Sequence, residues 1–166
     1  MLSIDEKRDF LRAVPMFNSL SEEQLAQLAE LCDDLTYQAG EDIFKQGEIG
    51  GALFIIVDGQ VLVQREVVRE TSTVSLNVIK SHQHFGEMTL FSDSPYSVTA
   101  TVLKPTTLLR VQRSVFVDFA RDHPNLLIEL NQVLSQRLEE AYDKISEITR
   151  NRKPRELRNL YEKLNF

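Results

Sequence analysis

The chain has 166 residues, of which 42% are hydrophobic, so it is long enough to bury one well-packed core. Its formal net charge of −6 argues against a general nucleic-acid binder, because contact with phosphates needs a basic face that this composition does not supply. The charge is uneven: residues 1–149 hold 13 Lys and Arg against 23 Asp and Glu, whereas residues 150–166 hold 6 against 2.

Cysteine content and hydropathy indicate the compartment. Cys32 is the only cysteine, which excludes an intramolecular disulfide and favours a reducing environment. The N-terminus has neither the basic nor the apolar region of a secretory signal, and no stretch approaches 18 apolar residues. We therefore expect a cytoplasmic protein with no transmembrane segment of its own.

Two short amphipathic helices are predicted within residues 1–33. Ser3 caps the first helix, and Pro15 ends it. Ser21, followed three residues later by Gln24, forms a capping box for the second. We expect this segment to be an N-terminal helical bundle.

Between residues 34 and 113, short apolar runs alternate with turn residues at close spacing. Asp58-Gly59 lies between two such runs and suits a two-residue type I′ hairpin, because both central positions of that turn need a positive φ. Further strands are predicted at 74–79, 98–102 and 106–111. Seven or eight short antiparallel strands indicate a mainly β fold with flanking α, built as a barrel or jelly roll.

Residues 114–150 predict two helices, the first ended by Pro124 and the second capped by Asn125. Apolar positions from Leu127 to Ile148 in the longer helix follow a near-heptad spacing with one irregularity. Two interpretations stay open. The apolar stripe packs on the chain's own barrel, or it contacts a protein partner or a second copy in a homodimer.

The last segment, 151–166, is predicted to be a basic amphipathic tail. Five basic residues lie within the nine positions 150–158, which span the start of this segment: Arg150, Arg152, Lys153, Arg155 and Arg158. Cations are favourable near the C-terminus of a helix, so the cluster is either a solvated helix end or a contact for an acidic partner or an anionic lipid surface.

The segment between residues 79 and 99 carries the most informative chemistry. Gly86 permits a tight backbone approach, and residues 87–91 can form one helical turn whose free N–H groups face an anion. The carboxylate of Glu87, beside that turn, can accept hydrogen bonds from sugar hydroxyls. These residues alone predict an anion site, made of a loop and a short helix, inside a barrel.

Catalytic and metal-binding patterns are missing from the sequence. No Ser-His-Asp ordering, Walker A loop or Gly-rich dinucleotide fingerprint occurs, so we expect no enzyme, no catalytic residue and no cofactor. His82 and His84 stand two apart and would share a face on a strand. No third His or Cys lies nearby, so no metal site is predicted.

Four motifs occur in order along the chain: Phe17-x-x-Leu20-Ser-x-x-x-Leu25, Ala39-Gly-Glu-x-Ile43-Phe-x-x-Gly47, Leu53-x-Ile-Ile-x-x-Gly59 and Phe85-Gly-Glu-Met-x-Leu90. Together they resemble the cyclic nucleotide-binding domain of catabolite activator proteins, cAMP-dependent kinase regulatory subunits and gated channels. The resemblance covers about residues 10–150. It implies an eight-stranded β-roll over 34–113 with a phosphate-binding cassette at 85–98, preceded by a helical bundle and followed by hinge and lid helices.

By this resemblance the ligand-binding residues are Phe85, Gly86, Glu87, Met88, Thr89, Pro95, Tyr96, Ser97 and Val98. Backbone N–H groups of Gly86, Met88 and Thr89 would bind a cyclic phosphate. The Glu87 carboxylate would bind the ribose hydroxyl. The family has an arginine after the cassette proline, whereas this chain has Tyr96.

The missing arginine leaves the cassette without a cation of its own. No Lys or Arg occurs from Ser81 through Leu103, while Glu87 and Asp93 give the cassette a local charge of −2. A charge-assisted contact between arginine and phosphate contributes about 1.5–3 kcal/mol, whereas a neutral phenol makes one ordinary hydrogen bond. We therefore predict a non-enzymatic regulatory or sensor module in which cyclic nucleotide binding is weak or absent.

Four alternatives remain open at this point. Arg65 or Arg69 replaces the missing cation, which would restore cAMP or cGMP binding. Tyr96 and Ser97 recognise an uncharged or differently shaped ligand. The pocket is vestigial, and the barrel is a protein-interaction scaffold. The fourth alternative is a transcription regulator that has lost its DNA-binding half. The residues after Arg150 are too few for the winged helix-turn-helix of such family members, so no DNA-binding domain is expected.

Overall fold

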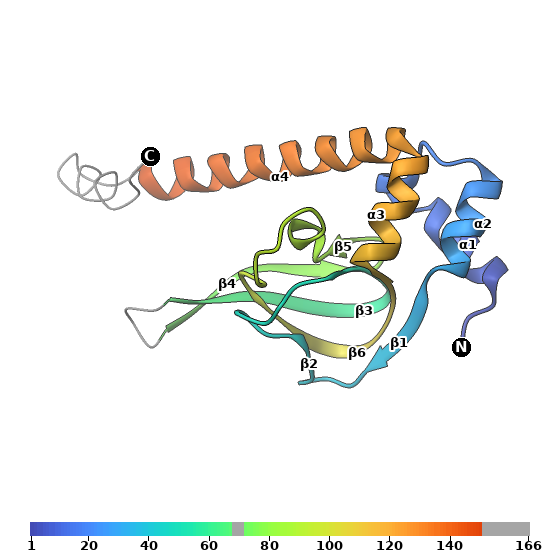
Figure 1. Ribbon diagram of the computed structural model, residues 1–166. Coiled ribbons are helices and arrows are strands. Elements are labelled where there is room, and N and C mark those ends of the chain that lie inside the picture. The colour runs from blue at the N-terminus through green and yellow to red at the C-terminus, as the bar shows by residue number, and fades with distance from the viewer. Residues whose placement is uncertain (68–71, 151–166) are drawn as a thin grey trace. The chain divides into compact units, whose positions relative to one another are not determined.

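The computed structural model describes residues 1–67 and 72–150. The chain divides into two compact units, Met1–Leu127 and Ile128–Phe166. The first unit holds the N-terminal helices and the whole sheet, shown in Figure 1. The predicted basic tail at 151–166 lies outside the described residues.

The N-terminal helices begin at the capping boxes that the sequence predicts. Helix α1 (Ile4–Arg12) has Ser3 as its N-cap, and helix α2 (Glu22–Glu30) has Ser21, with the η1 turn (Pro15–Phe17) between them. In each box the serine hydroxyl accepts a backbone N–H from three residues later, and the side chain of that later residue accepts the serine's own N–H. Both caps are therefore confirmed.

A buried charge connects the bundle to the first strand. Lys7 Nζ donates to the carbonyl of Cys32 at 2.7 Å and lies 3.1 Å from Asp34 Oδ1. The Lys7 ammonium, and to a smaller extent the Leu2 N–H, holds the pKa of the Asp34 carboxyl below its ordinary value. The Cys32 thiol donates to the carbonyl of Leu28, and burial raises the pKa of that thiol to about 12.

Six strands form one antiparallel sheet in the part of the chain that the structure describes. They are β1 (Asp33–Tyr37), β2 (Asp42–Phe44), β3 (Ala52–Val67), β4 (Ser72–Lys80), β5 (His84–Phe85) and β6 (Thr99–Gln112). The strand path is β1-β6-β3-β4, with β2 paired to β6 and β5 paired to β3. The predicted class, mainly β with flanking α in the form of a β-roll, is confirmed. Residues 1–67 and 72–150 hold six strands, where eight were expected.

The strand count differs because β3 and β6 are long and continuous. The predicted hairpin at Asp58-Gly59 is wrong: β3 runs through both residues, and its pairing with β6 shifts register on either side of Asp58. Gly59 has a φ of 109°, and an added Cβ would lie 2.7 Å from the Thr106 Cα on the neighbouring strand. The glycine therefore permits a bulge and a close backbone approach inside a strand rather than a turn between two strands.

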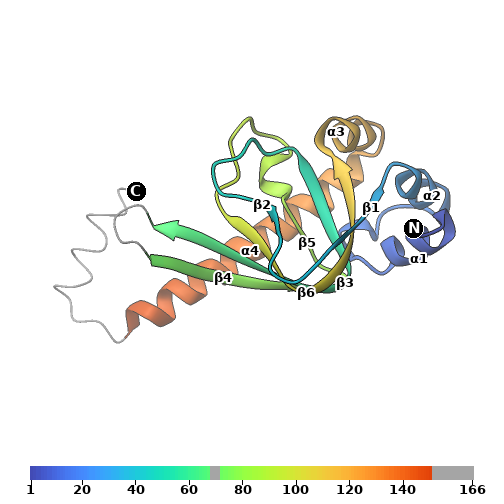
Figure 2. The same ribbon diagram turned by 90° about the horizontal axis from the view of Figure 1, so that it is seen from below.

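The β3–β4 hairpin extends past the end of β6, as Figure 2 shows from below. The last pair between β3 and β6 is Gln64 with Thr99, so Glu66 has a strand neighbour only in β4. The side-chain amide of Gln46 lies on the side of Glu66 that has no strand neighbour. Its Oε1 accepts the Glu66 N–H at 2.9 Å, and its Nε2 donates to the Glu66 carbonyl at 3.4 Å.

Helix α3 (Arg113–Asp122) follows the sheet, and α4 (Pro124–Arg150) begins one residue before the predicted cap. Proline is favoured at the first position of a helix because it has no N–H to satisfy there. Among the helices of residues 1–67 and 72–150, none is long and apolar enough to cross a membrane. The predicted domain boundaries at 33, 113 and 150 stay predictions.

The apolar stripe of α4 includes exposed positions. Leu138 is 53% exposed and Ile145 is 47% exposed. The side chain of Ile148, the last position of the predicted stripe, lies outside the described part of the chain. A partner or a second copy on this helix therefore stays a prediction.

Candidate ligand-binding site

The cassette begins where β5 ends, at a glycine in the left-handed region. Gly86 has φ 86° and ψ −6°, and the η2 turn (Glu87–Thr89) follows directly. A Cβ on Gly86 would lie 2.5 Å from the Ala52 carbonyl oxygen and 3.1 Å from Phe54 Cδ2. Both the backbone angle and the close approach to β3 therefore require glycine here.

The η2 turn uses part of the predicted donor set internally. The Thr89 N–H donates to the Gly86 carbonyl at 3.3 Å, and the Thr89 hydroxyl donates to the same carbonyl at 3.1 Å. Glu87 and Thr89 are buried, whereas Met88 is 69% exposed. The predicted phosphate donors Gly86, Met88 and Thr89 are thus adjacent, but the Thr89 N–H closes the turn itself.

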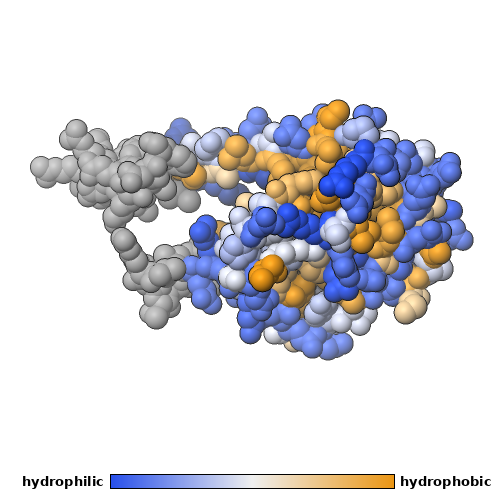
Figure 3. Space-filling view, in the orientation of Figure 1, coloured by the Kyte–Doolittle hydropathy of each residue, from blue (hydrophilic) through white to orange (hydrophobic). Residues whose placement is uncertain are grey.

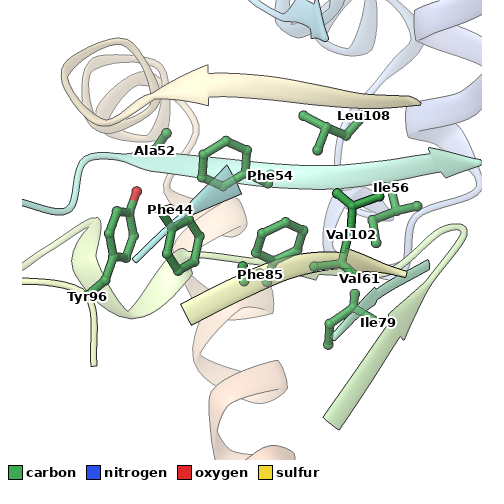
Figure 4. Close-up of a cluster of buried hydrophobic side chains, with 11 residues drawn as sticks. Phe44, Ala52, Phe54, Ile56, Val61, Ile79, Phe85, Tyr96, Val102 and Leu108 are labelled. Carbon is green, nitrogen blue, oxygen red and sulfur yellow. The ribbon is translucent and has the colours of Figure 1, made fainter. Parts of the chain in front are cut away.

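Tyr96 lies in the hydrophobic core. Its ring lies beside that of Phe44, as Figure 4 shows. The two rings stack with centroids 3.7 Å apart and planes at 11°, and Tyr96 is 7% exposed. The Tyr96 hydroxyl accepts the Gly51 N–H at 3.3 Å. The ring belongs to a cluster of buried side chains formed by Phe44, Ala52, Phe54, Ile56, Val61, Ile79, Phe85, Tyr96, Ala100, Val102 and Leu108.

The loop between β2 and β3 holds Tyr96 through its backbone as well. The Tyr96 N–H donates to the Glu48 carbonyl at 2.9 Å, and its carbonyl accepts the Gly47 N–H at 2.8 Å. At the other end of the cassette, a Cβ on Gly50 would lie 2.5 Å from Thr89 Cβ. The loop and the cassette are therefore in contact at two consecutive glycines. Thr89 packs against Gly50, and the Tyr96 hydroxyl accepts a hydrogen bond from Gly51.

The remaining predicted ligand-binding residues are divided between core and surface. Phe85 is buried and stacks on Phe54 with ring centroids 5.2 Å apart, and Val98 packs against the same cluster. Pro95 and Ser97 are exposed. The structure thus brings Phe85, Tyr96 and Val98 together as core residues, whereas Met88, Pro95 and Ser97 face solvent.

Arg113 is a cation beside the cassette that sequence reasoning missed. Its Nη1 lies 2.8 Å from Asp93 Oδ1, and its backbone N–H donates to the Gly51 carbonyl at 2.8 Å. The pairing spans 20 residues and depends on where β6 ends, so no local pattern marks it. Of the two arginines predicted as substitute cations, Arg65 is exposed and Arg69 lies outside the described residues.

Apolar side chains are exposed on and around the cassette. Ile49 in the loop is 94% exposed, and its backbone forms a bridge with Pro95. Met88 is 69% and Phe91 is 52% exposed. Figure 3 shows hydrophobic patches among hydrophilic surface on one face of the molecule. Part of the cassette's apolar surface is therefore open to solvent.

The histidines near the cassette do not share a strand face. His82 lies in a turn with a φ of 64° and stacks on Phe10, whereas His84 is buried in β5. Within the described residues, no group of three or more His, Cys, Asp or Glu side chains is placed to hold a metal ion.

The β-roll, the left-handed glycine and the short helical turn after it are the features that the comparison with known families has to explain. Residues 34–123 match the family described as the cyclic nucleotide-binding domain, and the chain belongs to this family. Its curated relatives include the cGMP-dependent protein kinase egl-4 of Caenorhabditis elegans, 35% identical over 85 residues, or 51% of this chain and 11% of that protein. The cAMP-dependent protein kinase regulatory subunit of Dictyostelium discoideum is 31% identical over 110 residues, 65% of this chain and 34% of that protein.

Solved structures show the same fold. The Thermus thermophilus catabolite activator protein superimposes with a TM-score of 0.74 at 27% identity, covering 81% of this chain and 63% of that one. The sensor domain of the transcriptional regulator DNR from Pseudomonas aeruginosa gives 0.73 at 27% identity, covering 84% and 93%. The chain spans only 10% to 34% of the length of the curated relatives it matches.

Proposed function

We propose that this chain is a non-enzymatic regulatory module of the cyclic nucleotide-binding domain family whose cassette binds cyclic nucleotide weakly or not at all. The observation that carries the proposal is the position of Tyr96. Its side chain is packed on Phe44 in the core and bonded to Gly51, where the family motif has an arginine for the phosphate. The cassette therefore lacks the charged contact on which affinity for a cyclic phosphate depends.

Electrostatics support the same conclusion. Glu87 and Asp93 carry the charges of the cassette, and the nearby Arg113 is paired with Asp93. Loss of a charge-assisted bidentate contact lowers affinity by about 10- to 100-fold. The relatives named above are one protein kinase and one kinase regulatory subunit, and this chain covers a minor part of each. We therefore propose only the regulatory role and a cytoplasmic setting.

Isothermal titration with cAMP and cGMP at millimolar ligand tests this proposal. We expect the wild-type chain to show no binding, or dissociation constants in the millimolar range. Tyr96→Arg should raise affinity by about tenfold or more, because a guanidinium restores the charged contact. Tyr96→Phe is the matched control, since it keeps the ring and adds no charge. Micromolar binding by the wild-type chain would contradict the proposal outright.

A second variant separates charge from shape. Thr89 packs against Gly50, so the loop and the cassette are in close contact at this position. Combining Thr89→Ala with Tyr96→Arg should raise affinity beyond Tyr96→Arg alone if this packing obstructs the site. An unchanged affinity in both variants would mean that the pocket has degenerated elsewhere.

A protein-interaction scaffold is the second candidate function. The exposed apolar side chains Ile49, Met88 and Phe91 favour it, because surface of this kind is typical of contacts with other proteins. A substitute cation would favour cyclic nucleotide binding instead, and Arg113 is better placed than Arg65. Asp93→Asn releases Arg113, so a gain of affinity in that variant would identify it as the cation.

A further inference from the structure

Gln24 and His123 meet at the junction between α3 and α4, although 99 residues separate them in sequence. Gln24 Nε2 and His123 Nδ1 are 3.0 Å apart, and both residues belong to the first unit. His123 is the C-cap of α3, with φ −129° and ψ 67°, and its carbonyl accepts the N–H of Leu126 in α4. His123 therefore lies where α3 ends and the first turn of α4 begins.

The capping box of α2 fixes which end of the Gln24 amide faces the histidine. Gln24 Oε1 accepts the Ser21 N–H at 2.8 Å, so the Nε2 end lies toward His123. An amide nitrogen only donates, so Nδ1 of His123 must accept, which requires a neutral ring with its proton on Nε2. Turning the amide over would set its NH₂ group against the Ser21 N–H and break the capping box.

Among the described residues, the His123 ring has an aromatic neighbour and a polar one, Gln24. The Phe119 ring lies 4.3 Å from the imidazole, centroid to centroid. The charged residues within two positions of Gln24 or His123 in the sequence are Arg121 and Asp122 on α3 and Glu22 and Glu23 on α2. Arg121 is paired with Asp118, and Glu22 with Arg12. The α4 residues inside the first unit, 124–127, carry no charge, and no ion pair found within the described residues includes His123.

We propose that Gln24 and His123 form a proton-sensitive latch, which holds the α3–α4 junction to the N-terminal bundle while His123 is neutral. Protonation places an N–H on Nδ1, opposite the N–H of Gln24, and the contact is lost because both groups are then donors. The proton taken up by the His123 ring is therefore the event that opens the latch. This inference does not depend on whether the cassette binds a ligand.

The tautomer of His123 gives the first test, on the unmodified full chain. The sequence has three histidines, so ¹⁵N-labelled histidine gives a spectrum in which His123→Gln identifies the signals of His123. At pH 8 we expect the proton on Nε2 and none on Nδ1. A proton on Nδ1 at that pH would overturn the proposal, because the geometry of the latch would then be impossible.

Hydrogen exchange at the junction gives the second test. After correction for intrinsic rates, the amides of residues 123 and 125–127 should exchange about fivefold faster at pH 5.5 than at pH 8, as loss of one hydrogen bond implies. Gln24→Glu should reverse this dependence, because a carboxylate accepts both the Ser21 N–H and a protonated His123. Gln27→Glu, exposed on the same helix, is the matched control and should keep the wild-type dependence.

Two results would contradict the latch. One is the same pH dependence in Gln24→Glu as in the wild-type chain. The other is an unchanged pH dependence in His123→Gln, which would assign the effect to another group. If Gln24→Glu fails to fold, the tautomer measurement on the wild-type chain still decides the matter.

Discussion

Two buried polar side chains, Lys7 in the N-terminal bundle and Tyr96 in the cassette, have opposite kinds of partner. Lys7 is 8% exposed and has the carboxylate of Asp34 and the carbonyl of Cys32 within 3.1 Å. Tyr96 is 7% exposed and has an aromatic ring and one backbone N–H. A buried cation has to be compensated by charge, whereas a phenol needs only one hydrogen bond. In this molecule buried charge attaches helices to the sheet, and the cassette is held by apolar packing.

The largest effect on stability should come from removing the apolar packing of Tyr96. Tyr96→Ala removes a buried ring and its stack on Phe44, so we expect the free energy of unfolding to fall by about 3 kcal/mol. Urea denaturation measures the change. Tyr96→Phe loses only the bond to Gly51, which should cost about 0.5–1 kcal/mol. Equal losses in the two variants would mean that the hydroxyl, rather than the ring, holds the cassette.

Removing the carboxylate that compensates the Lys7 ammonium should lower the free energy of unfolding by a somewhat smaller amount. Asp34→Asn leaves Lys7 buried without its counter-charge, and because Asp34 is 14% exposed we expect a loss of about 2–3 kcal/mol. Asp33→Asn is the matched control, since Asp33 forms a more exposed pair with Arg110 and should cost well under 1 kcal/mol. Equal losses of stability in the two variants would mean that burial does not decide how much the Lys7–Asp34 and Arg110–Asp33 pairs contribute.

The pH dependence of stability distinguishes the Lys7–Asp34 pair from the packing of Tyr96, and its expected effect is the smallest of the three. The Lys7 ammonium lowers the pKa of Asp34 in the folded chain, so this pair stabilises the fold above the carboxyl's ordinary value of about 3.9. That contribution is lost as the pH falls through the lower, folded value. Stability curves of wild type and Asp34→Asn should therefore converge below about pH 4, whereas the Tyr96→Ala difference should persist. Parallel curves for Asp34→Asn would show that its effect is not one of charge.

Local rules sufficed for the helix starts and the class of the fold. Ser3 and Ser21 cap their helices through contacts three residues away, so the pattern in the sequence contains the whole interaction. The four ordered motifs indicated the family, and Gly86 has the left-handed conformation that a tight turn after β5 requires. These features could be predicted because each depends on residues that are close in the chain.

Features that depend on distant partners could not be predicted. Gly59 has the positive φ expected of a turn, but Thr106 on the neighbouring strand decides that it lies in a bulge. The motif register identified Tyr96 as a departure from the family, yet its stack on Phe44 joins residues on different strands and loops. Arg113 was missed for the same reason, since its pairing with Asp93 arises only when β6 ends beside the cassette.

The amide of Gln46 has a consequence for how copies of this chain meet in concentrated solution. An extended hairpin with free main-chain groups invites a strand from another molecule, which is a common first step of aggregation. Here a side chain imitates the missing strand, because one amide satisfies both the N–H and the carbonyl of Glu66. An incoming chain would have to displace Gln46 before it could pair at that point, so the fold protects this edge without a proline or a lysine.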